Sequence, residues 1–146
     1  MSTTPTLTPR LIGETEKSLN AILDRLLAGT NLDEHQWVTL TLTMSLTGDG
    51  PIDREDLVGR VAHALKVDDA RARARIDELK AAGLLDVAEG EGAQVSATES
   101  GQRLHARVRT GTAEIVDRLW GDLPAEDLTV AARILSVVRD RANELH

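Results

Sequence analysis

The sequence predicts a mainly α-helical protein that carries one small β-hairpin. Apolar residues recur at spacings of three and four along most of the 146 residues, which is the period of helices with one buried face. Aromatic residues make up only 1%, as two tryptophans without Phe or Tyr, so the core must consist of aliphatic side chains. One stretch around a Glu-Gly-Glu-Gly turn reads instead as two short strands. A chain of this length is expected to form one domain.

The first helix is expected after a loose arm of residues 1 to 8, which are rich in Ser, Thr and Pro. Apolar residues with helical spacing begin at Leu11 and continue to Leu27. Gly29 should end this helix, because glycine readily adopts the left-handed conformation found just after a helix.

The second helix is expected to start at Asn31, with the acidic Asp33 and Glu34 near its positive end. Its second half is rich in threonine and could also form a strand. We favour a helix because four residues would then share one stripe, and the Gly-Asp-Gly-Pro segment that follows would end it. These four residues are Leu32, Gln36, Leu40 and Met44.

Two short helices separated by two or three residues come next. Asp53 should cap the third helix, whose inner side would hold Leu57, Val61, Ala64 and Leu65. Asp68 should cap the fourth helix and Gly83 should end it. Two short helices joined so tightly are a candidate helix-turn-helix.

A hairpin and two further helices complete the chain. The segment "LLDVAEGEGAQVSAT" predicts the two strands and their turn. Thr98 should cap a helix that runs to about Trp120, roughly 34 Å at the standard rise per residue. The last helix should begin after Pro124, with apolar Val130, Ile134, Leu135, Val138 and Leu145 along it.

The composition argues against several classes of function. The chain has no cysteine, which excludes disulfides, thiol redox chemistry and the common zinc frameworks. Neither a signal peptide nor a membrane span is recognisable, so we expect a cytoplasmic protein without a membrane partner. With almost no aromatic residues on which bases could stack, we do not expect the chain to bind single-stranded nucleic acid. No catalytic or phosphate-binding motif is present, and we expect a non-enzyme without a cofactor.

The four histidines do not form a metal-binding pattern. His35, His63, His105 and His146 include no pair at a spacing of four residues and no His-Glu-x-x-His arrangement. We therefore expect no metal site within one segment. His35 and His105 could meet near the junction of the second and fifth helices, where a response to pH or to a ligand is a hypothesis.

Three segments, in this order and spacing, resemble the multiple-antibiotic-resistance regulator (MarR) family of winged-helix transcription factors. "LDEHQWVTL" is similar to the family's Leu-Thr-x-x-Gln-Trp pattern. "DLVGRVAHALKVDDARARARIDELKAAGLL" is similar to its helix-turn-helix, which ends in Leu-x-x-x-Gly-Leu. "VSATESGQRL" is similar to the run that follows the wing, as the family's hairpin is called.

The resemblance implies a homodimer that binds double-stranded DNA. Residues 9–28 and 99–146 would then form dimerisation helices, and residues 32–97 a winged helix-turn-helix head within a single domain. Each head would read half of a palindromic site. The apolar residues of the terminal helices support a dimer independently, because a lone helix pair leaves them exposed. The alternative is that these helices fold back on the head of the same chain.

The arginines of the fourth helix alternate with alanines in a way that suits a DNA groove. On a helical wheel, Ala72, Ile76 and Leu79 form the buried stripe. Ala70 and Ala74 would then point outward, with Arg71 and Arg75 on one flank and Arg73 on the other. Small residues between guanidinium groups would let the helix lie close to a major groove.

We expect Arg71 and Arg73 to contact bases or phosphates, and Arg75, Arg54 and Lys66 to contact the DNA backbone. The alternative is a solvated helix with internal ion pairs, such as Asp69 with Arg73 and Arg71 with Glu78. The whole chain has a net charge of -7. Residues 53–82 hold seven basic and seven acidic side chains, so any basic surface must come from segregation of charges.

The wing departs from the family pattern. In place of a basic tip the chain has "AEGEGAQ", with Glu89 and Glu91. Carboxylates should avoid the negative potential of a narrow minor groove. This favours a second hypothesis, in which the winged-helix dimer no longer reads DNA and serves as a protein- or ligand-binding module.

The resemblance also implies an effector site near the second helix, between the head and the dimerisation helices. Trp37, His35 and His105 are the candidate residues. With no Phe or Tyr in the chain, such a pocket would be aliphatic and would suit a small lipophilic ligand. A core position is the other reading of Trp37.

Overall fold

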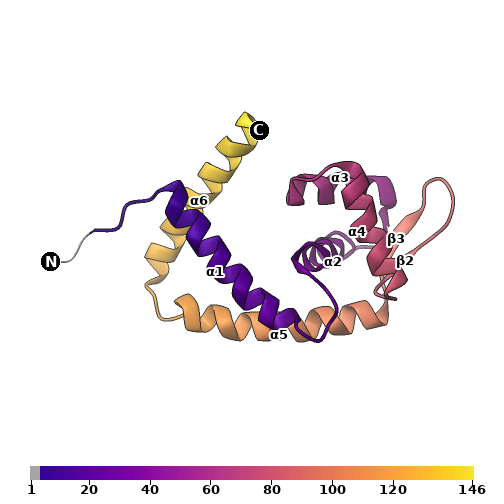
Figure 1. Cartoon of the computed structure of the whole chain (residues 1–146), viewed down its shortest axis with the longest axis horizontal. Helices are drawn as coiled ribbons and strands as arrows, with labels where there is room; N and C mark the ends of the chain where they lie inside the picture. The colour runs from indigo at the N-terminus through magenta and orange to yellow at the C-terminus, as the bar shows by residue number, and fades with distance from the viewer. Residues whose placement is uncertain (1–3) are drawn as a thin grey trace. The chain divides into compact units, whose positions relative to one another are not determined.

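The structure, a computed structural model, describes residues 4–146 (Figure 1). The helices and strands follow one another in the order α1 (Pro9–Leu27), α2 (Glu34–Leu46), β1 (Ile52–Asp53), α3 (Arg54–Leu65), α4 (Asp69–Ala81), β2 (Leu85–Val87), β3 (Gln94–Ala97), α5 (Glu99–Trp120) and α6 (Ala125–Leu145). The chain divides into two compact units, one up to Gly111 and one from Thr112 to His146, and the division lies within α5. The mainly α-helical fold with a small hairpin is confirmed; of the expected N-terminal arm, residues 1–3 lie outside the described part.

Side-chain caps fix where α1 and α2 begin. Thr8 precedes Pro9 and accepts a hydrogen bond from the amide of Leu11 at 3.0 Å. At α2, the carboxylate of Asp33 accepts from the Gln36 amide at 2.8 Å, and the Gln36 side chain accepts from the Asp33 amide at 3.0 Å. The expected start at Asn31 is two residues too early, because this reciprocal cap holds the helix start at Asp33.

The threonines of α2 stay helical because their hydroxyls bond within the helix. Thr39 donates to the carbonyl of His35 and Thr43 to that of Thr39, both at 2.8 Å. Satisfied in this way, both threonines are fully buried beside Leu40. The buried face therefore differs from the predicted stripe, of which Leu32, Gln36 and Met44 are only half-buried.

The helix-turn-helix forms as its caps predict. Asp53 accepts from the amides of Glu55 and Asp56 at the start of α3, and Asp68 accepts from the Arg71 amide at 2.8 Å at the start of α4. Between them Lys66 turns the chain in the left-handed conformation, with φ 58°. The predicted buried face of α3 is partly wrong, because Ala64 is exposed and Leu65 is only half-buried. The buried residues of this helix are Leu57, Val58, Val61 and Ala62.

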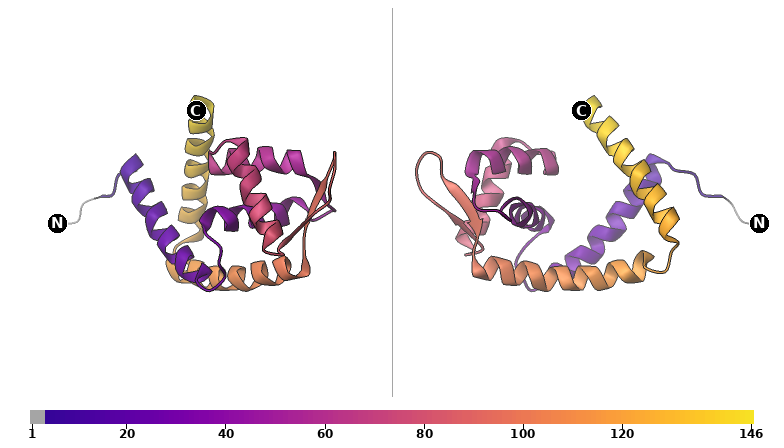
Figure 2. Two further views of the ribbon diagram at one scale, coloured as in Figure 1. Left: turned by 45° about the vertical axis from the view of Figure 1, so that its right-hand side comes forward. Right: turned by 180° about the vertical axis from the view of Figure 1, so that it is seen from behind.

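The predicted hairpin is part of a three-stranded antiparallel sheet in the order β1-β3-β2. Leu85 pairs with Ala97 and Val87 with Val95, and the two residues of β1 pair with the other edge of β3. Strand β1 was not expected. Val95 of the central strand is fully buried in the core that α2, α3 and α4 share with the sheet. The tip of the hairpin extends away from these helices (Figure 2).

Thr98 joins the end of α4 to the start of α5. Its hydroxyl donates to the carbonyl of Gly83 at 2.7 Å and accepts from the Gly101 amide at 3.0 Å. Gly101 is buried, and a methyl group at its Cα would overlap the carbonyl oxygen of Leu84. The close approach at this joint therefore depends on glycine.

The second unit contains the end of α5 and the whole of α6. Helix α6 has no buried residue, although apolar side chains recur along it. Those with the largest exposed fractions are Val130, Ile134, Leu135, Val137, Val138 and Leu145. Among residues 4–146, no helix combines the length and hydropathy required to cross a bilayer.

Candidate nucleic-acid interface

The inner and outer faces of α4 lie as the wheel predicts, with one correction. Ala72, Ile76 and Leu79 are fully buried, and Ala70 and Arg71 are exposed. Ala74, expected to point outward with Ala70, is only half-exposed. Residues three and four positions apart are neighbours on a helix surface, so the long side chains of Arg71 and Glu78 can cover part of Ala74.

Arg71 is the unpaired arginine of this helix. Its backbone amide donates to Asp68, but within residues 4–146 its guanidinium group makes no hydrogen bond or ion pair. An exposed guanidinium group presents five N–H donors in one plane, which is the geometry that fits a phosphate or a guanine edge. The guanidinium group of Arg71 is therefore not engaged by another described residue, and its contact with DNA stays a prediction.

Arg73 lies on the opposite flank, where it contacts α3. Its Nη2 donates to Oε2 of Glu55 at 2.8 Å, and the two side chains are 42% and 58% exposed. The intrahelical pair with Asp69 that the sequence allowed is not formed. Glu55 was missed at the sequence level because it is 18 residues away and only the fold brings it to Arg73.

Arg75 is engaged within its own helix. Its Nη2 donates to Oε2 of Glu78 at 2.9 Å, and the other oxygen of this carboxylate accepts from the side chain of Gln36 in α2 at 3.0 Å. Only 27% of the Arg75 side chain is exposed. Glu78 therefore forms an ion pair within α4, as one alternative from the sequence allowed, but its partner is Arg75 and not Arg71.

Arg54 and Lys66, the two other predicted DNA contacts, lie at opposite ends of α3. The amide of Arg54 donates to the carbonyl of Ala93 in the wing at 2.8 Å, and its Nε lies 3.6 Å from Oε1 of Glu55. Lys66 is exposed at the turn into α4. Glu55 thus has two arginines beside it, Arg54 and Arg73.

The wing is acidic in the structure as well. Glu89 and Glu91 are exposed, and both lie in the turn between β2 and β3. No basic residue occurs between Leu85 and Thr98. A carboxylate-bearing tip adds negative potential on that side of α4, which opposes contact with a phosphate backbone.

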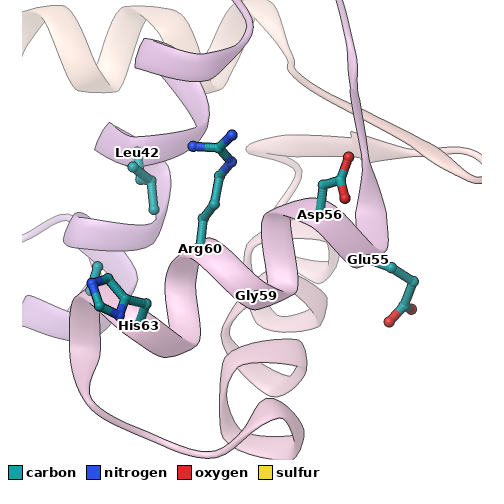
Figure 3. Close-up of a pocket in the computed structure, with 7 residues that line it drawn as sticks. Leu42, Glu55, Asp56, Gly59, Arg60 and His63 are labelled. Atoms are coloured by element: carbon teal, nitrogen blue, oxygen red, sulfur yellow. The ribbon is translucent and has the colours of Figure 1, made fainter. Parts of the chain in front are cut away.

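A hollow of about 640 Å³ lies between α2 and α3. Leu42 of α2 faces Arg60 and His63 of α3 across it, and Glu55 lines its rim with the carboxylate directed away from Leu42 and His63 (Figure 3). The lining combines apolar and charged groups of both signs. The predicted effector residues do not line this hollow.

Two of the predicted effector residues contact each other. The rings of Trp37 and His105 stack with centroids 5.0 Å apart and planes inclined by 19°. His35 precedes Trp37 by two residues, which places the two side chains on nearly opposite sides of α2. It is therefore the Trp37 ring, rather than that of His35, that meets His105.

The structure offers no assembled metal centre in its described part. Within residues 4–146, no three His, Asp or Glu side chains lie together in a way that could hold a metal ion.

Comparison with known proteins finds similarity in fold alone. No family model and no curated protein matches the sequence. The crystal structure of the transcriptional regulator SlyA matches with a TM-score of 0.77 and 19% identity, over 92% of this chain and 93% of that one. The MarR protein from Peptoclostridium difficile matches with a TM-score of 0.75 and 17% identity, over 98% and 96%.

A third match concerns ligand control. Bordetella bronchiseptica BpsR, whose DNA binding is regulated by 6-hydroxynicotinic acid, matches with a TM-score of 0.69 and 21% identity. The match covers 96% of this chain and 98% of that one. All three matches span nearly the whole of both chains. The chain therefore has the winged-helix fold of the MarR and SlyA transcriptional regulators.

Proposed function

We propose that the chain is a non-enzymatic transcriptional regulator that binds double-stranded DNA through α4. The observation that carries this proposal is Arg71, which is exposed and unpaired within residues 4–146 on the outer face of a helix-turn-helix. The fold supports it, because the matching structures include regulators of transcription. Arg71 would contact base edges or phosphates, and Arg73 would add a second contact once freed from Glu55.

The regulator would act as a homodimer on a palindromic operator. Support comes from α6, which has apolar side chains along its length and no buried residue. A second copy of the same helix would cover this surface. Two heads related by a twofold axis would then read half-sites about one helical turn, roughly 34 Å, apart.

A small lipophilic ligand would release the DNA by changing the separation of the two heads. BpsR supports the general scheme, since a small aromatic acid regulates its DNA binding. In this chain the effector would act near Trp37 and His105, where α2 contacts α5. A ligand shifts the equilibrium only if it binds one spacing of the heads more tightly than the other.

The test is a gel-shift titration on the promoter region that neighbours the gene, at several salt concentrations. Arg71→Ala should weaken binding at least tenfold and reduce the salt dependence, because each phosphate contact contributes about 0.9 to the log–log slope. The control is Arg10→Ala, which removes one positive charge from an exposed position in α1, distant in sequence from α4. This variant should bind DNA with an affinity within about twofold of the wild type. Equal and weak binding by the wild type and Arg71→Ala at low salt would refute the proposal.

A second function is favoured by one specific group of observations. Two of the three arginines of α4 are paired with carboxylates, and the wing carries Glu89 and Glu91. A winged-helix dimer of this kind could instead bind a protein or a ligand without reading DNA. That function would be indicated by a stable dimer whose DNA binding is weak and insensitive to Arg71.

A further inference from the structure

The carboxylate of Glu55 is hydrogen-bonded to the guanidinium group of Arg73, which lies on one flank of α4 and is predicted to contact DNA. Its Oε2 accepts from Nη2 of Arg73 at 2.8 Å, and its Oε1 lies 3.6 Å from Nε of Arg54. Glu55 also belongs to the rim of the hollow between α2 and α3, and its carboxylate points away from Leu42 and His63 (Figure 3). One exposed carboxylate thus lies beside two arginines that are predicted to contact DNA, and its single negative charge offsets one of their two positive charges.

The two carboxylates that pair with arginines of α4 differ in their surroundings. Glu78 accepts from Gln36 as well as from Arg75, so it ties α4 to α2. Glu55 is 58% exposed and accepts hydrogen bonds from Arg73 alone among the described residues. An ion pair this exposed adds little to stability, and an incoming phosphate can break it. The pair between Arg73 and Glu55 is therefore the exchangeable one.

We propose that Glu55 sets the DNA affinity of the head by competing with phosphate for Arg73, an inference that rests on the proposed function. While the pair is closed, the carboxylate neutralises Arg73 and repels an approaching phosphate. Only a site that positions an acceptor well enough displaces the carboxylate. Glu55 thus lowers binding to arbitrary polyanions more than binding to the operator, and acts as a specificity-determining residue.

The experiment compares Glu55→Gln with Asp56→Asn. Both changes remove one negative charge from the first turn of α3, but Asp56 pairs with no arginine among the described residues. The first readout is the salt concentration at which each protein elutes from immobilised heparin, a polyanion without sequence. Glu55→Gln should elute at clearly higher salt than both Asp56→Asn and the wild type. In an Arg73→Ala background, Glu55→Gln should have no effect beyond that of Asp56→Asn.

The second readout is the affinity for the promoter duplex and for a scrambled duplex, measured by fluorescence anisotropy. Glu55→Gln should tighten scrambled-duplex binding about five- to tenfold and steepen the log–log salt slope by about 0.9, the value for one added phosphate contact. Tightening on the promoter duplex should be smaller. Circular dichroism and urea midpoints verify that each variant is folded.

Two outcomes would overturn the inference. Equal heparin elution of Glu55→Gln and Asp56→Asn would show that only net charge matters, and weaker binding by Glu55→Gln would show that the carboxylate orients Arg73 productively. Both results are independent of whether a promoter is bound. Failure of the proposed function has a different signature, in which Glu55→Gln gains heparin affinity while neither protein distinguishes promoter from scrambled DNA.

Discussion

Trp37 of α2 and His105 of α5 stack face to face, with ring centroids 5.0 Å apart and an interplanar angle of 19°. His105 is only 8% exposed, so its neutral ring completes the apolar contact with the indole. Burial lowers the pKa of His105 below the ordinary 6.5, and the nearby Arg109 lowers it further. This pair links α2 to the part of α5 that belongs to the same unit.

The folded protein should lose stability in mild acid because of His105. A lowered pKa means that the unfolded chain binds the proton more readily, so this contribution is complete above pH 6.5 and is lost as the pH falls below it. The measurement is the free energy of unfolding in urea at pH 5.5 and 7.5. His105→Phe keeps an aromatic ring beside Trp37 without a titrating group and should show a smaller loss on acidification. Identical pH dependence in both proteins would assign the effect to other groups.

Gly101→Ala should be strongly destabilising. The added methyl group would overlap the backbone oxygen of Leu84, and neither α5 nor the start of β2 can yield without breaking the bonds of Thr98. We expect a loss of about 2–4 kcal/mol in the free energy of unfolding. Gly59→Ala is the matched control, because it lies inside α3 with open space at its Cα and should gain up to about 1 kcal/mol. A Gly101→Ala protein as stable as the wild type would disprove the close contact.

Asp68→Ala should weaken the start of α4. The carboxylate accepts from the Arg71 amide at 2.8 Å, and loss of such a cap costs about 1 kcal/mol. Asp68→Asn keeps an acceptor oxygen at the cap and should retain most of the stability. The urea midpoint measures both variants. If Asp68→Asn lost as much as Asp68→Ala, the charge and not the cap hydrogen bond would be responsible.

Ile134→Glu should impair self-association. Ile134 is one of the exposed apolar side chains of α6, and a buried carboxylate without a partner in a dimer interface is costly. Light scattering coupled to gel filtration should show a twofold lower mass for this variant than for the wild type at micromolar concentration. Ala132→Glu introduces the same charge on the opposite side of the helix and should remain dimeric. A monomeric wild type would remove the homodimer from the proposal.

Local signals account for what the sequence predicts well. Asp53, Asp68 and Thr98 were identified as caps because capping is a contact between residues two or three apart. The hairpin followed from its glycine-rich turn for the same reason. The start of α2 was misplaced because Asn31 and Asp33 are both good caps, and only the reciprocal bonds with Gln36 decide between them.

Contacts between distant residues could not be predicted in the same way. Strand β1 has two residues, too few for any periodic signal, and it exists because β3 offers it an edge. Glu55 and Arg73 are 18 residues apart, so the sequence suggested pairs within α4 instead. The stacking of Trp37 on His105 likewise depends on how α2 and α5 meet. The candidate residues could be found from the sequence, whereas their partners required the fold.

The hydroxyl of Thr98 makes the passage from α4 to α5 a stiff joint. One hydrogen bond holds the carbonyl that follows α4, and the other holds the first turn of α5, while Gly101 lets the two backbones touch. A hinge at this point would have to break all three contacts at once. A displacement of the first turns of α5 would instead also displace the C-terminal end of α4. Because α4 is one continuous helix, such a displacement would change the orientation of the whole helix and with it the position of Arg71.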